Sequence, residues 1–234
     1  MNSIDQYLTL LLNGSQSAYV DQLAVIASRT ATWLPLAVVL LYVLVRHNNL
    51  VTLAWTVLGL ALAIALADQV ASSVFKPLVE RFRPAQDPSI MYMVDVVNGY
   101  RGGLYGFFSS HAANTFAVAT FVALLIKDHS LTLWLYSWSF VNCWSRVYLG
   151  VHYIGDVLTG AVWGLFVGWA IYKLWEKHAH HTNLWSSCQQ RRATQNAPAS
   201  TQLTASGFGI ASVHLLIAAL ALTYLYITLR ALCA

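Results

Sequence analysis

Three polar segments of the sequence, residues 76–84, 107–111 and 145–156, carry side chains of the kind that phosphoryl transfer requires. A phosphoryl group in transit spreads negative charge over its equatorial oxygens, so catalysis depends on positioned groups that stabilise this charge. The candidates are three cations, two histidines, two hydroxyls and a carboxylate: Lys76, Arg83, Ser109, Ser110, His111, Arg146, His152 and Asp156. We expect these residues to form one active site.

The cations predict a cradle for the phosphate. The planar guanidinium groups of Arg83 and Arg146 can each donate two hydrogen bonds to a pair of phosphate oxygens, and Lys76 adds a point charge. Ser109 and the free backbone N–H groups of the helix that follows it add neutral donors, because a helix N-terminus attracts anions.

The histidines predict covalent and acid–base chemistry. His152 precedes Asp156 by four residues, so the carboxylate can hold one ring nitrogen and direct the other toward phosphorus. His111 could protonate the departing oxygen. The carboxylate sets typical of magnesium sites and the His and Cys sets typical of zinc sites are missing from the three segments, so we expect neither a metal nor another cofactor.

The amino-acid composition indicates the class of protein that carries these residues. Of the 234 residues, 58% are hydrophobic and 9% are charged, against roughly 25% charged in soluble domains. The mean hydropathy is +0.57, and so few charges cannot cover the surface of a soluble core. The chain is therefore predicted to be an integral membrane protein. The small net charge of +4 argues against a nucleic-acid partner, and the three cysteines suggest no disulfide framework.

Continuous apolar stretches predict an all-α fold with six transmembrane helices, since only helices satisfy their backbone hydrogen bonds one segment at a time. The predicted spans are 31–45, 51–75, 111–126, 131–148, 156–175 and 208–229. The chain then divides into an interfacial N-terminal segment, a core with five transmembrane helices, a polar cytoplasmic loop and the sixth helix. These regions cover residues 1–30, 31–176, 177–207 and 208–234.

Six crossings place all three polar segments at the same membrane face. The linkers toward the other face contain Arg46, Lys127, Lys173, Lys177, Arg191 and Arg192, with only two acidic residues. The positive-inside rule makes that other face cytoplasmic. We therefore expect a multi-pass protein of a bacterial inner membrane, with its active site facing the periplasm.

The pattern Lys-x6-Arg-Pro, Ser-x-His and Ser-Arg-x5-His-x3-Asp, from Lys76 to Asp156, resembles the three signature motifs of the type 2 phosphatidic acid phosphatase superfamily. The resemblance implies a helical core shared with haloperoxidases and a metal-independent phosphohistidine mechanism. It makes His152 the nucleophile, Asp156 its orienting partner and His111 the general acid. Phe108 and Ser110 stand where the family usually has proline and glycine.

Within that superfamily, residues 98–116 resemble lipid A 4′-phosphatases and undecaprenyl-diphosphate phosphatases of the Bacteroides group. The resulting hypothesis is a lipid phosphatase, with the 4′-phosphate of lipid A as the first expected target. Undecaprenyl diphosphate and phosphatidylglycerophosphate are the alternative substrates. The expected partners are the phosphorylated lipid and the bilayer, without an obligate protein partner.

Other classes of function remain open from the sequence. A phosphotransferase would pass the phosphate to a second lipid hydroxyl instead of water. A non-catalytic lipid-binding or transport protein would keep the cationic pocket without chemistry, although binding alone does not require His152 to precede Asp156 by four residues. Haloperoxidase chemistry is disfavoured by the predicted membrane spans.

Roles can also be predicted for polar residues outside the expected active site. Arg101 lies among glycines on the active face, and we expect it to contact a second anionic group of the lipid. Asp68 is expected to pair with a neighbour such as Asn142 and hold helices together. We expect Glu80 and Arg81 to form a solvated pair. His178, His180 and His181 are expected to lie in a solvated loop, and His214 is expected to have a structural role.

Overall fold

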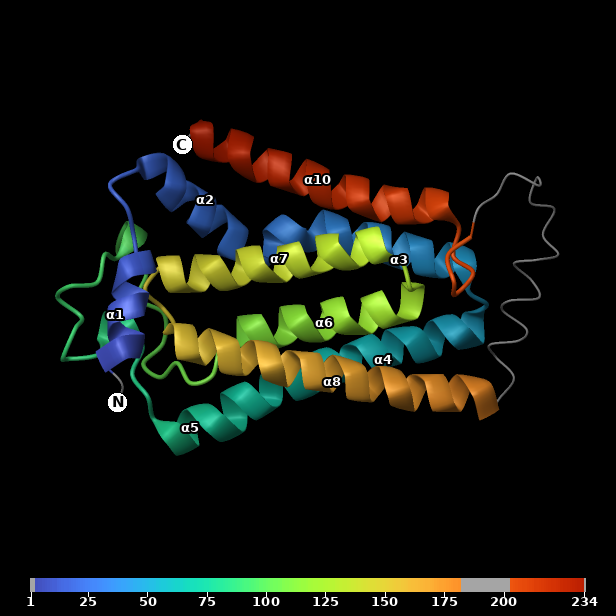
Figure 1. The fold of residues 1–234 in the computed structure, drawn as a ribbon, viewed down its shortest axis with the longest axis horizontal. Coiled ribbons are helices and arrows are strands. Elements are labelled where there is room, and N and C mark those ends of the chain that lie inside the picture. Colours follow the sequence, from blue (N-terminus) through green and yellow to red (C-terminus); the bar gives the residue numbers. More distant parts are fainter. Residues whose placement is uncertain (1–2, 182–202, 234) are drawn as a thin grey trace.

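The computed structural model describes residues 3–181 and 203–233, and these residues form a bundle of helices along one long axis (Figure 1). The long helices of the bundle are α3 (Leu34–His47), α4 (Leu50–Gln69), α6 (Ser110–Ile126), α7 (His129–Tyr148), α8 (Ile154–His181) and α10 (Ile210–Leu232). The expectation of an all-helical protein is confirmed for the residues that the structure describes.

Two further helical segments continue α4 without a break. They are the π-helical segment η2 (Val70–Phe75) and the short helix α5 (Lys76–Val79). Together with α4 they form a rod of 30 residues from Leu50 to Val79. Lys76, the first residue of the first motif, therefore lies at the end of a long apolar helix.

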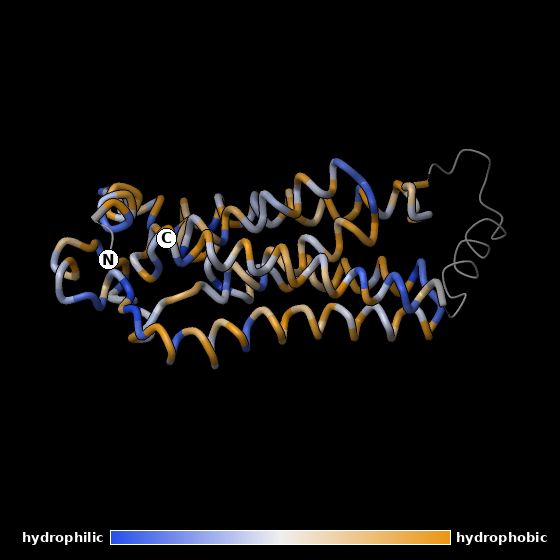
Figure 2. The backbone as a smooth tube through the Cα atoms, turned by 60° about the horizontal axis from the view of Figure 1, so that its bottom comes forward, coloured by the Kyte–Doolittle hydropathy of each residue, from blue (hydrophilic) through white to orange (hydrophobic). Residues whose placement is uncertain are grey.

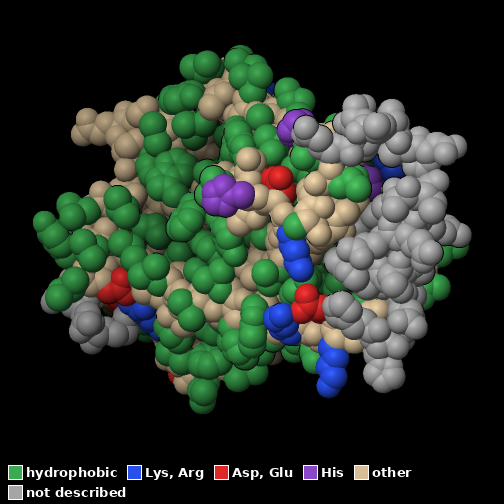
Figure 3. Space-filling model, turned by 45° about the vertical axis from the view of Figure 1, so that its right-hand side comes forward, with side chains coloured by type: hydrophobic (Ala, Val, Ile, Leu, Met, Phe, Trp, Pro, Cys, Tyr) green, Lys and Arg blue, Asp and Glu red, His purple; other side chains and the backbone are tan. Residues whose placement is uncertain are grey.

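Four helical stretches in the described residues are long and apolar enough to cross a membrane: Thr30–His47, Leu50–Val79, Ile154–Ala179 and Ile210–Leu232. Helix α6 is apolar but has only 17 residues. Hydrophobic residues follow the length of the bundle, while hydrophilic stretches gather toward its ends (Figure 2). In Figure 3, hydrophobic side chains gather over the left part of the face, as expected for a surface in contact with lipid.

Helices α6 and α8 make the most extensive helix contact among the described residues, and small residues let them approach closely. Gly160, Gly164 and Gly168 recur every fourth residue on α8, where a Cβ would clash with backbone oxygens of α6. Those oxygens belong to Ser109, Ala113 and Ala117. Small residues at this spacing let helix backbones approach closely in membranes. The contact fixes the beginning of α6 against the beginning of α8, where the second and third motifs lie.

The N-terminal region forms two helices, α1 (Ser3–Leu12) and α2 (Ala18–Ser28). They are separated by a turn in which Gly14 has a φ of 63°. Helix α1 lies across one end of the bundle, and α2 runs beside α7 and α10 (Figure 1). The 3₁₀-helix η1 (Thr30–Trp33) then leads directly into α3.

Residues 80–109 form a long connection across the same end of the bundle as α1. This connection contains the 3₁₀-helices η3 (Pro84–Gln86) and η4 (Val97–Gly99). An isolated bridge joins Phe82 to Tyr105, so the two ends of the connection lie side by side. This pairing brings the first motif next to the residues that precede the second.

The first residues of the polar loop expected at 177–207 are helical. Helix α8 continues to His181, because its last turns still pack against the bundle: Ala179 is buried, and the ring centroid of His178 lies 4.0 Å from that of Trp55. The expectation that His178 is solvated is therefore wrong. The side chains of His180 and His181 and residues 182–202 lie outside the described part, and His214 is exposed on α10.

Candidate active site

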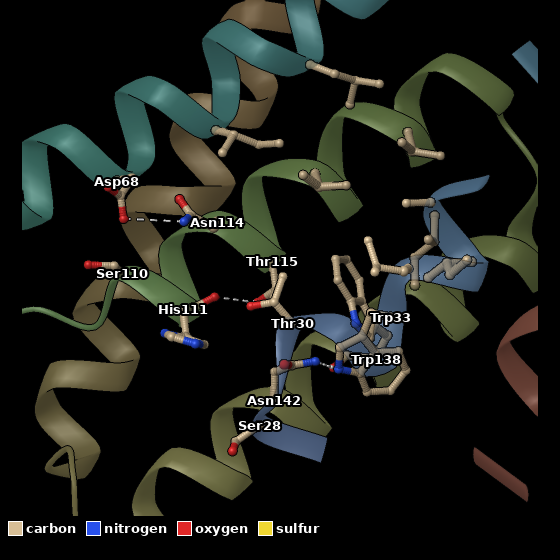
Figure 4. A pocket seen from close by; sticks show the side chains of 18 of the residues that line it. Ser28, Thr30, Trp33, Asp68, Ser110, His111, Asn114, Thr115, Trp138 and Asn142 are labelled. Carbon is tan, nitrogen blue, oxygen red and sulfur yellow. Dashed lines mark hydrogen bonds between the residues drawn. The ribbon is translucent and has the colours of Figure 1, made fainter. Parts of the chain in front are cut away.

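The three polar segments meet around one cavity of about 720 Å³. Its lining includes most of the predicted site residues: Lys76, Arg83, Ser110, His111, Arg146 and His152. They come from the end of α4 and α5, from the 80–109 connection, from the start of α6 and from both sides of the turn between α7 and α8. The cavity then continues between the helices into an apolar interior. Its lining side chains, including His111, are drawn in Figure 4.

His152 and Asp156 are in contact and deeply buried. Nδ1 of His152 lies 3.5 Å from Oδ2 of Asp156, and both side chains are almost completely inaccessible. The two atoms are in contact, but Nδ1 of His152 forms no aligned hydrogen bond in this geometry. The other ring nitrogen, Nε2, lies 3.4 Å from Nη1 of Arg83. The imidazole of His152 thus lies between the carboxylate of Asp156 and the guanidinium of Arg83.

His152 lies in the turn between α7 and α8, outside both helices. Its burial, together with the positive charges of Arg83 and Arg146, holds its pKa well below the ordinary value of 6.5. The imidazole is therefore neutral near pH 7 and keeps a lone pair available on Nε2. A neutral ring is the form that a nucleophilic histidine needs.

Asp156 is fixed by more than the histidine. Its Oδ1 accepts a hydrogen bond of 2.6 Å from Nη1 of Arg81, and its Oδ2 accepts one of 3.1 Å from the backbone N–H of Tyr153. Arg81 also binds Oδ2 of Asp5 at 2.6 Å. The expectation that Arg81 forms a solvated pair with Glu80 is wrong, because α1 folds over this end of the bundle and buries the guanidinium between two carboxylates.

The three predicted phosphate-binding cations form no direct ion pair. None of the ion pairs among the described residues includes Lys76, Arg83 or Arg146. Arg83 instead donates to the backbone oxygens of Tyr105 and Val151, both at 3.2 Å. Uncompensated cations in a largely buried cavity are costly, so their arrangement favours an anionic ligand.

Neutral groups hold the other two cations in place. Lys76 Nζ donates to the hydroxyls of Ser110 at 2.7 Å and Ser72 at 3.1 Å. Arg146 is buried and donates from Nη2 to the Tyr100 hydroxyl at 3.3 Å. Its Nε has no hydrogen-bond partner among the described residues. Several N–H groups of the cradle therefore remain available for phosphate oxygens.

Ser109 and Arg101 occupy positions that differ from the expectation. Ser109 is buried and does not line the cavity; its hydroxyl caps α6 by accepting from the N–H of Ala112. Arg101 is exposed and donates from Nη1 to the backbone oxygen of Ala85 at 2.7 Å. Neither geometry supports the predicted contact with substrate, and Ser110 takes the cavity position instead.

Two further residues at the site escaped the sequence analysis. Gly106 packs over His152 and Asp156: a Cβ there would lie 3.1 Å from Oδ2 of Asp156 and 3.5 Å from Nδ1 of His152. Asp5 reaches the site from the N-terminal helix and also accepts from the N–H of Gly155 at 3.0 Å. The glycine-rich run before the second motif was a signal for Gly106, whereas nothing local marked Asp5.

Comparison with known families agrees with this geometry. The PAP2 superfamily matches residues 52–180, more than half of the chain and all three motifs. The chain belongs to the PAP2 superfamily. The resemblance inferred from the motifs is thereby confirmed, as is the expectation of an enzyme of the phosphatase class. Among the described residues, no group of three or more His, Cys, Asp or Glu side chains could hold a metal ion.

Two curated PAP2 relatives are similar over most of their length. A protein of Bacteroides thetaiotaomicron named lipid A 4′-phosphatase is 38% identical over 173 residues, which cover 74% of this chain and 77% of the relative. A protein of the same name from Porphyromonas gingivalis is 34% identical over 185 residues, covering 79% of this chain and 78% of the relative.

A solved PAP2 structure shares the fold. The crystal structure of a transmembrane PAP2 type phosphatidylglycerolphosphate phosphatase from Bacillus subtilis superposes with a TM-score of 0.56 at 21% identity. The match covers 75% of this chain and 86% of the solved chain. The helical bundle described above is therefore a PAP2-type transmembrane fold.

Proposed function

We propose that this PAP2 protein removes the 4′-phosphate of lipid A through a phosphohistidine intermediate on His152. The observation that carries the proposal is the cavity, which begins among the three uncompensated cations and continues into the apolar interior of the bundle. A lipid phosphate fits such a cavity, because its anionic phosphate can lie among the cations and its apolar chains in the apolar part. The names of the Bacteroides and Porphyromonas relatives support lipid A as the target.

In the first step, Nε2 of His152 attacks phosphorus while Asp156 orients the ring through Nδ1. A nitrogen–phosphorus bond forms, and the bond from phosphorus to the lipid oxygen breaks. The negative charge of the bound phosphate favours the protonated form of His111, which gives its proton to that oxygen. Arg83, Arg146 and Lys76 stabilise the charge on the equatorial oxygens. The cation nearest to the attacking atom is Arg83, at 3.4 Å from Nε2.

In the second step, water attacks the phosphorylated histidine. The nitrogen–phosphorus bond breaks, inorganic phosphate leaves, and the proton lost by water returns to His111. His111 thereby regains the protonated form that it needs for the next lipid. In both steps the transferred proton is carried by His111, which lines the cavity.

The proposed topology has six membrane crossings. Four are the helical stretches that are long and apolar enough to cross a membrane, and the other two are α6 and α7. Arg46, Lys127, Lys173 and Lys177 lie at helix ends opposite to the active site. Under the positive-inside rule this end is cytoplasmic. The active site would then face the periplasm of a bacterial inner membrane.

Phosphate release by the purified protein in detergent, with a chelator present, tests the function. Lipid A, undecaprenyl diphosphate and phosphatidylglycerophosphate are offered in parallel, with His152→Ala as the inactive variant. His214→Ala, which removes an exposed histidine on α10, is the matched control. We expect release from lipid A, lost only in His152→Ala. Release from another of these lipids alone would reassign the substrate, and transfer of phosphate to a second lipid would indicate a phosphotransferase.

A further inference from the structure

The wall of the cavity changes in chemistry with depth along α4. The lining residues of α4 and of its continuation through η2 and α5 follow one face at nearly every fourth position: Val57, Leu60, Ile64, Asp68, Ser72 and Lys76. Toward the bundle interior the face is apolar, and at the phosphate end it is cationic. Asp68 and Ser72 lie between these two parts, within a helix that is otherwise suited to crossing a membrane.

Helices α6 and α7 repeat this order. On α6, Ser110 and His111 are followed by Asn114 and Thr115 and then by valines; on α7, Arg146 is followed inward by Asn142 and then by Trp138 and Leu135. The cavity therefore has a phosphate end, an apolar end and a polar middle layer, which we define as Asp68, Asn114, Thr115 and Asn142 (Figure 4).

Two members of the middle layer are already satisfied by backbone groups. Asn142 donates from Nδ2 to the oxygen of Trp138 at 2.9 Å, and Thr115 donates to the oxygen of His111 at 2.9 Å. These are local contacts within a helix. They stabilise α6 and α7 without requiring anything from a ligand.

Asp68 and Asn114 are different, because their acceptor atoms have few donors among the described residues. Oδ1 of Asp68 receives a single long hydrogen bond, of 3.5 Å, from Nδ2 of Asn114 (Figure 4). Oδ1 of Asn114 is buried and has no hydrogen-bond partner among the described residues. The expected partner Asn142 is therefore not the one that Asp68 uses. An ionised carboxylate can accept about four hydrogen bonds, and unmet acceptors at membrane depth are costly.

We propose that Asp68 and Asn114 bind a hydrogen-bond-donating group of the substrate, a hydroxyl or an amide N–H, that lies between its phosphate and its apolar chains. This inference rests on the proposed function and deepens it by naming a class of lipid. Asp68 lies four residues, or about 6 Å of helix, deeper than Ser72, whose hydroxyl contacts Lys76. The pair is thus placed to contact the unit directly attached to the phosphate.

The chemistry of this pair discriminates among lipid phosphates. A polyprenyl diphosphate continues from its phosphates into a hydrocarbon chain that donates no hydrogen bond. The ester groups of phosphatidic acid only accept hydrogen bonds, so they leave both oxygens unmatched. An acylated amino sugar offers an amide N–H at this depth. The middle layer therefore favours a phosphorylated glycolipid or another lipid whose phosphate is attached to a donor-bearing unit.

A competing explanation is that Asp68 serves as a counter-charge for Lys76 and contacts no substrate. Both residues line the cavity on the same face of one helix. Loss of a counter-charge would change phosphate binding, which all substrates share. Loss of a donor-binding group would change only the preference between lipids with and without donors. The ratio of two rates separates the explanations.

The test uses two phosphomonoesters with two chains each, ceramide 1-phosphate, which carries a hydroxyl and an amide N–H, and phosphatidic acid, which carries neither. The kcat/KM of both is measured in mixed micelles for the parent protein, Asp68→Leu and Asn114→Leu. Ser73→Ala is the matched control, because Ser73 is exposed on the neighbouring helical turn. Asn114→Leu removes no charge and reports on the same site if Asp68→Leu fails to fold.

We expect the parent protein to prefer ceramide 1-phosphate and either leucine variant to lower the ratio of the two kcat/KM values about 10- to 100-fold. The ratio should stay unchanged in Ser73→Ala. An equal loss on both lipids in the variants, or a parent protein without the preference, would overturn the inference and leave the phosphatase function intact. If the parent protein releases phosphate from neither of them nor from lipid A, the proposed function itself fails.

Discussion

Arg81 and His152 share the carboxylate of Asp156, each through a different oxygen. Nη1 of Arg81 lies 2.6 Å from Oδ1, and Nδ1 of His152 lies 3.5 Å from Oδ2. Arg81 in turn binds Asp5 of the N-terminal helix and packs at 4.1 Å from the ring centroid of Tyr153. The orientation of His152, the proposed nucleophile, therefore depends on a chain of polar contacts that begins outside the three motifs.

Replacement of Arg81 should disturb this chain at its centre. In Arg81→Gln, Asp156 loses its buried cationic partner, so we expect kcat to fall about 100-fold with little change in KM, because the ring is misplaced rather than the phosphate site emptied. Loss of one partner of a buried ion pair also costs about 3 to 5 kcal/mol of stability. Steady-state kinetics and thermal unfolding check both effects. Glu80→Gln, at the exposed neighbouring position, should change neither.

Asp5 offers a test of the role of helix α1. Its carboxylate binds Arg81 and the N–H of Gly155, which is at the first turn of α8. We expect Asp5→Asn to lower kcat about tenfold, since a charge-assisted hydrogen bond is weakened. Tyr7→Ala changes an exposed residue of the same helix and should be neutral. Parental turnover in Asp5→Asn would show that α1 does not position the site.

The protonation of His152 predicts how activity depends on pH. Because burial and the nearby charges of Arg83 and Arg146 lower its pKa below 6.5, the ring stays neutral as the pH falls through that value. The nucleophile should therefore be lost only at more acidic pH, and the acidic limb of kcat/KM should lie below 6.5 after correction for the titration of the lipid phosphate. An acidic limb at or above 6.5 would contradict the buried, neutral histidine.

The close packing of α6 on α8 can be tested at Gly164. A Cβ at this position would clash with the backbone oxygen of Ala113, so Gly164→Ala must push the two helices apart. We expect a loss of about 1 to 3 kcal/mol in stability, measured by unfolding in detergent, together with reduced turnover. Val162→Ala alters an exposed position of α8 and serves as the control. An equally stable Gly164→Ala protein would refute the tight contact.

The sequence predicted the parts of the site that depend on short spacings. The four-residue step from His152 to Asp156 places both at the turn into α8, and the three motifs line one cavity because each follows or precedes a long helix. The helical character of the chain followed from its continuous apolar stretches. The lengths of these stretches were less informative, since α8 extends to His181 through packing against α4.

Contacts between distant segments could not be predicted in this way. Asp5 reaches Gly155 across 150 residues of sequence because α1 folds over the end of the bundle, and no local pattern encodes that return. The partner of Asp68 depends on how α4 and α6 are rotated about their axes, which brings Asn114 rather than Asn142 to the carboxylate. Arg81 was expected to be solvated because its partners, Asp5 and Asp156, are distant in the sequence.

The covalent intermediate is the central claim, and trapping it is the most direct test. The protein is mixed with lipid A carrying radiolabelled phosphate, quenched in alkali, in which phosphohistidine is stable, and digested for peptide mapping. We expect label on His152 in the parent protein and none in His152→Ala. Label on a different residue, or release of phosphate by His152→Ala at the parental rate, would contradict the mechanism.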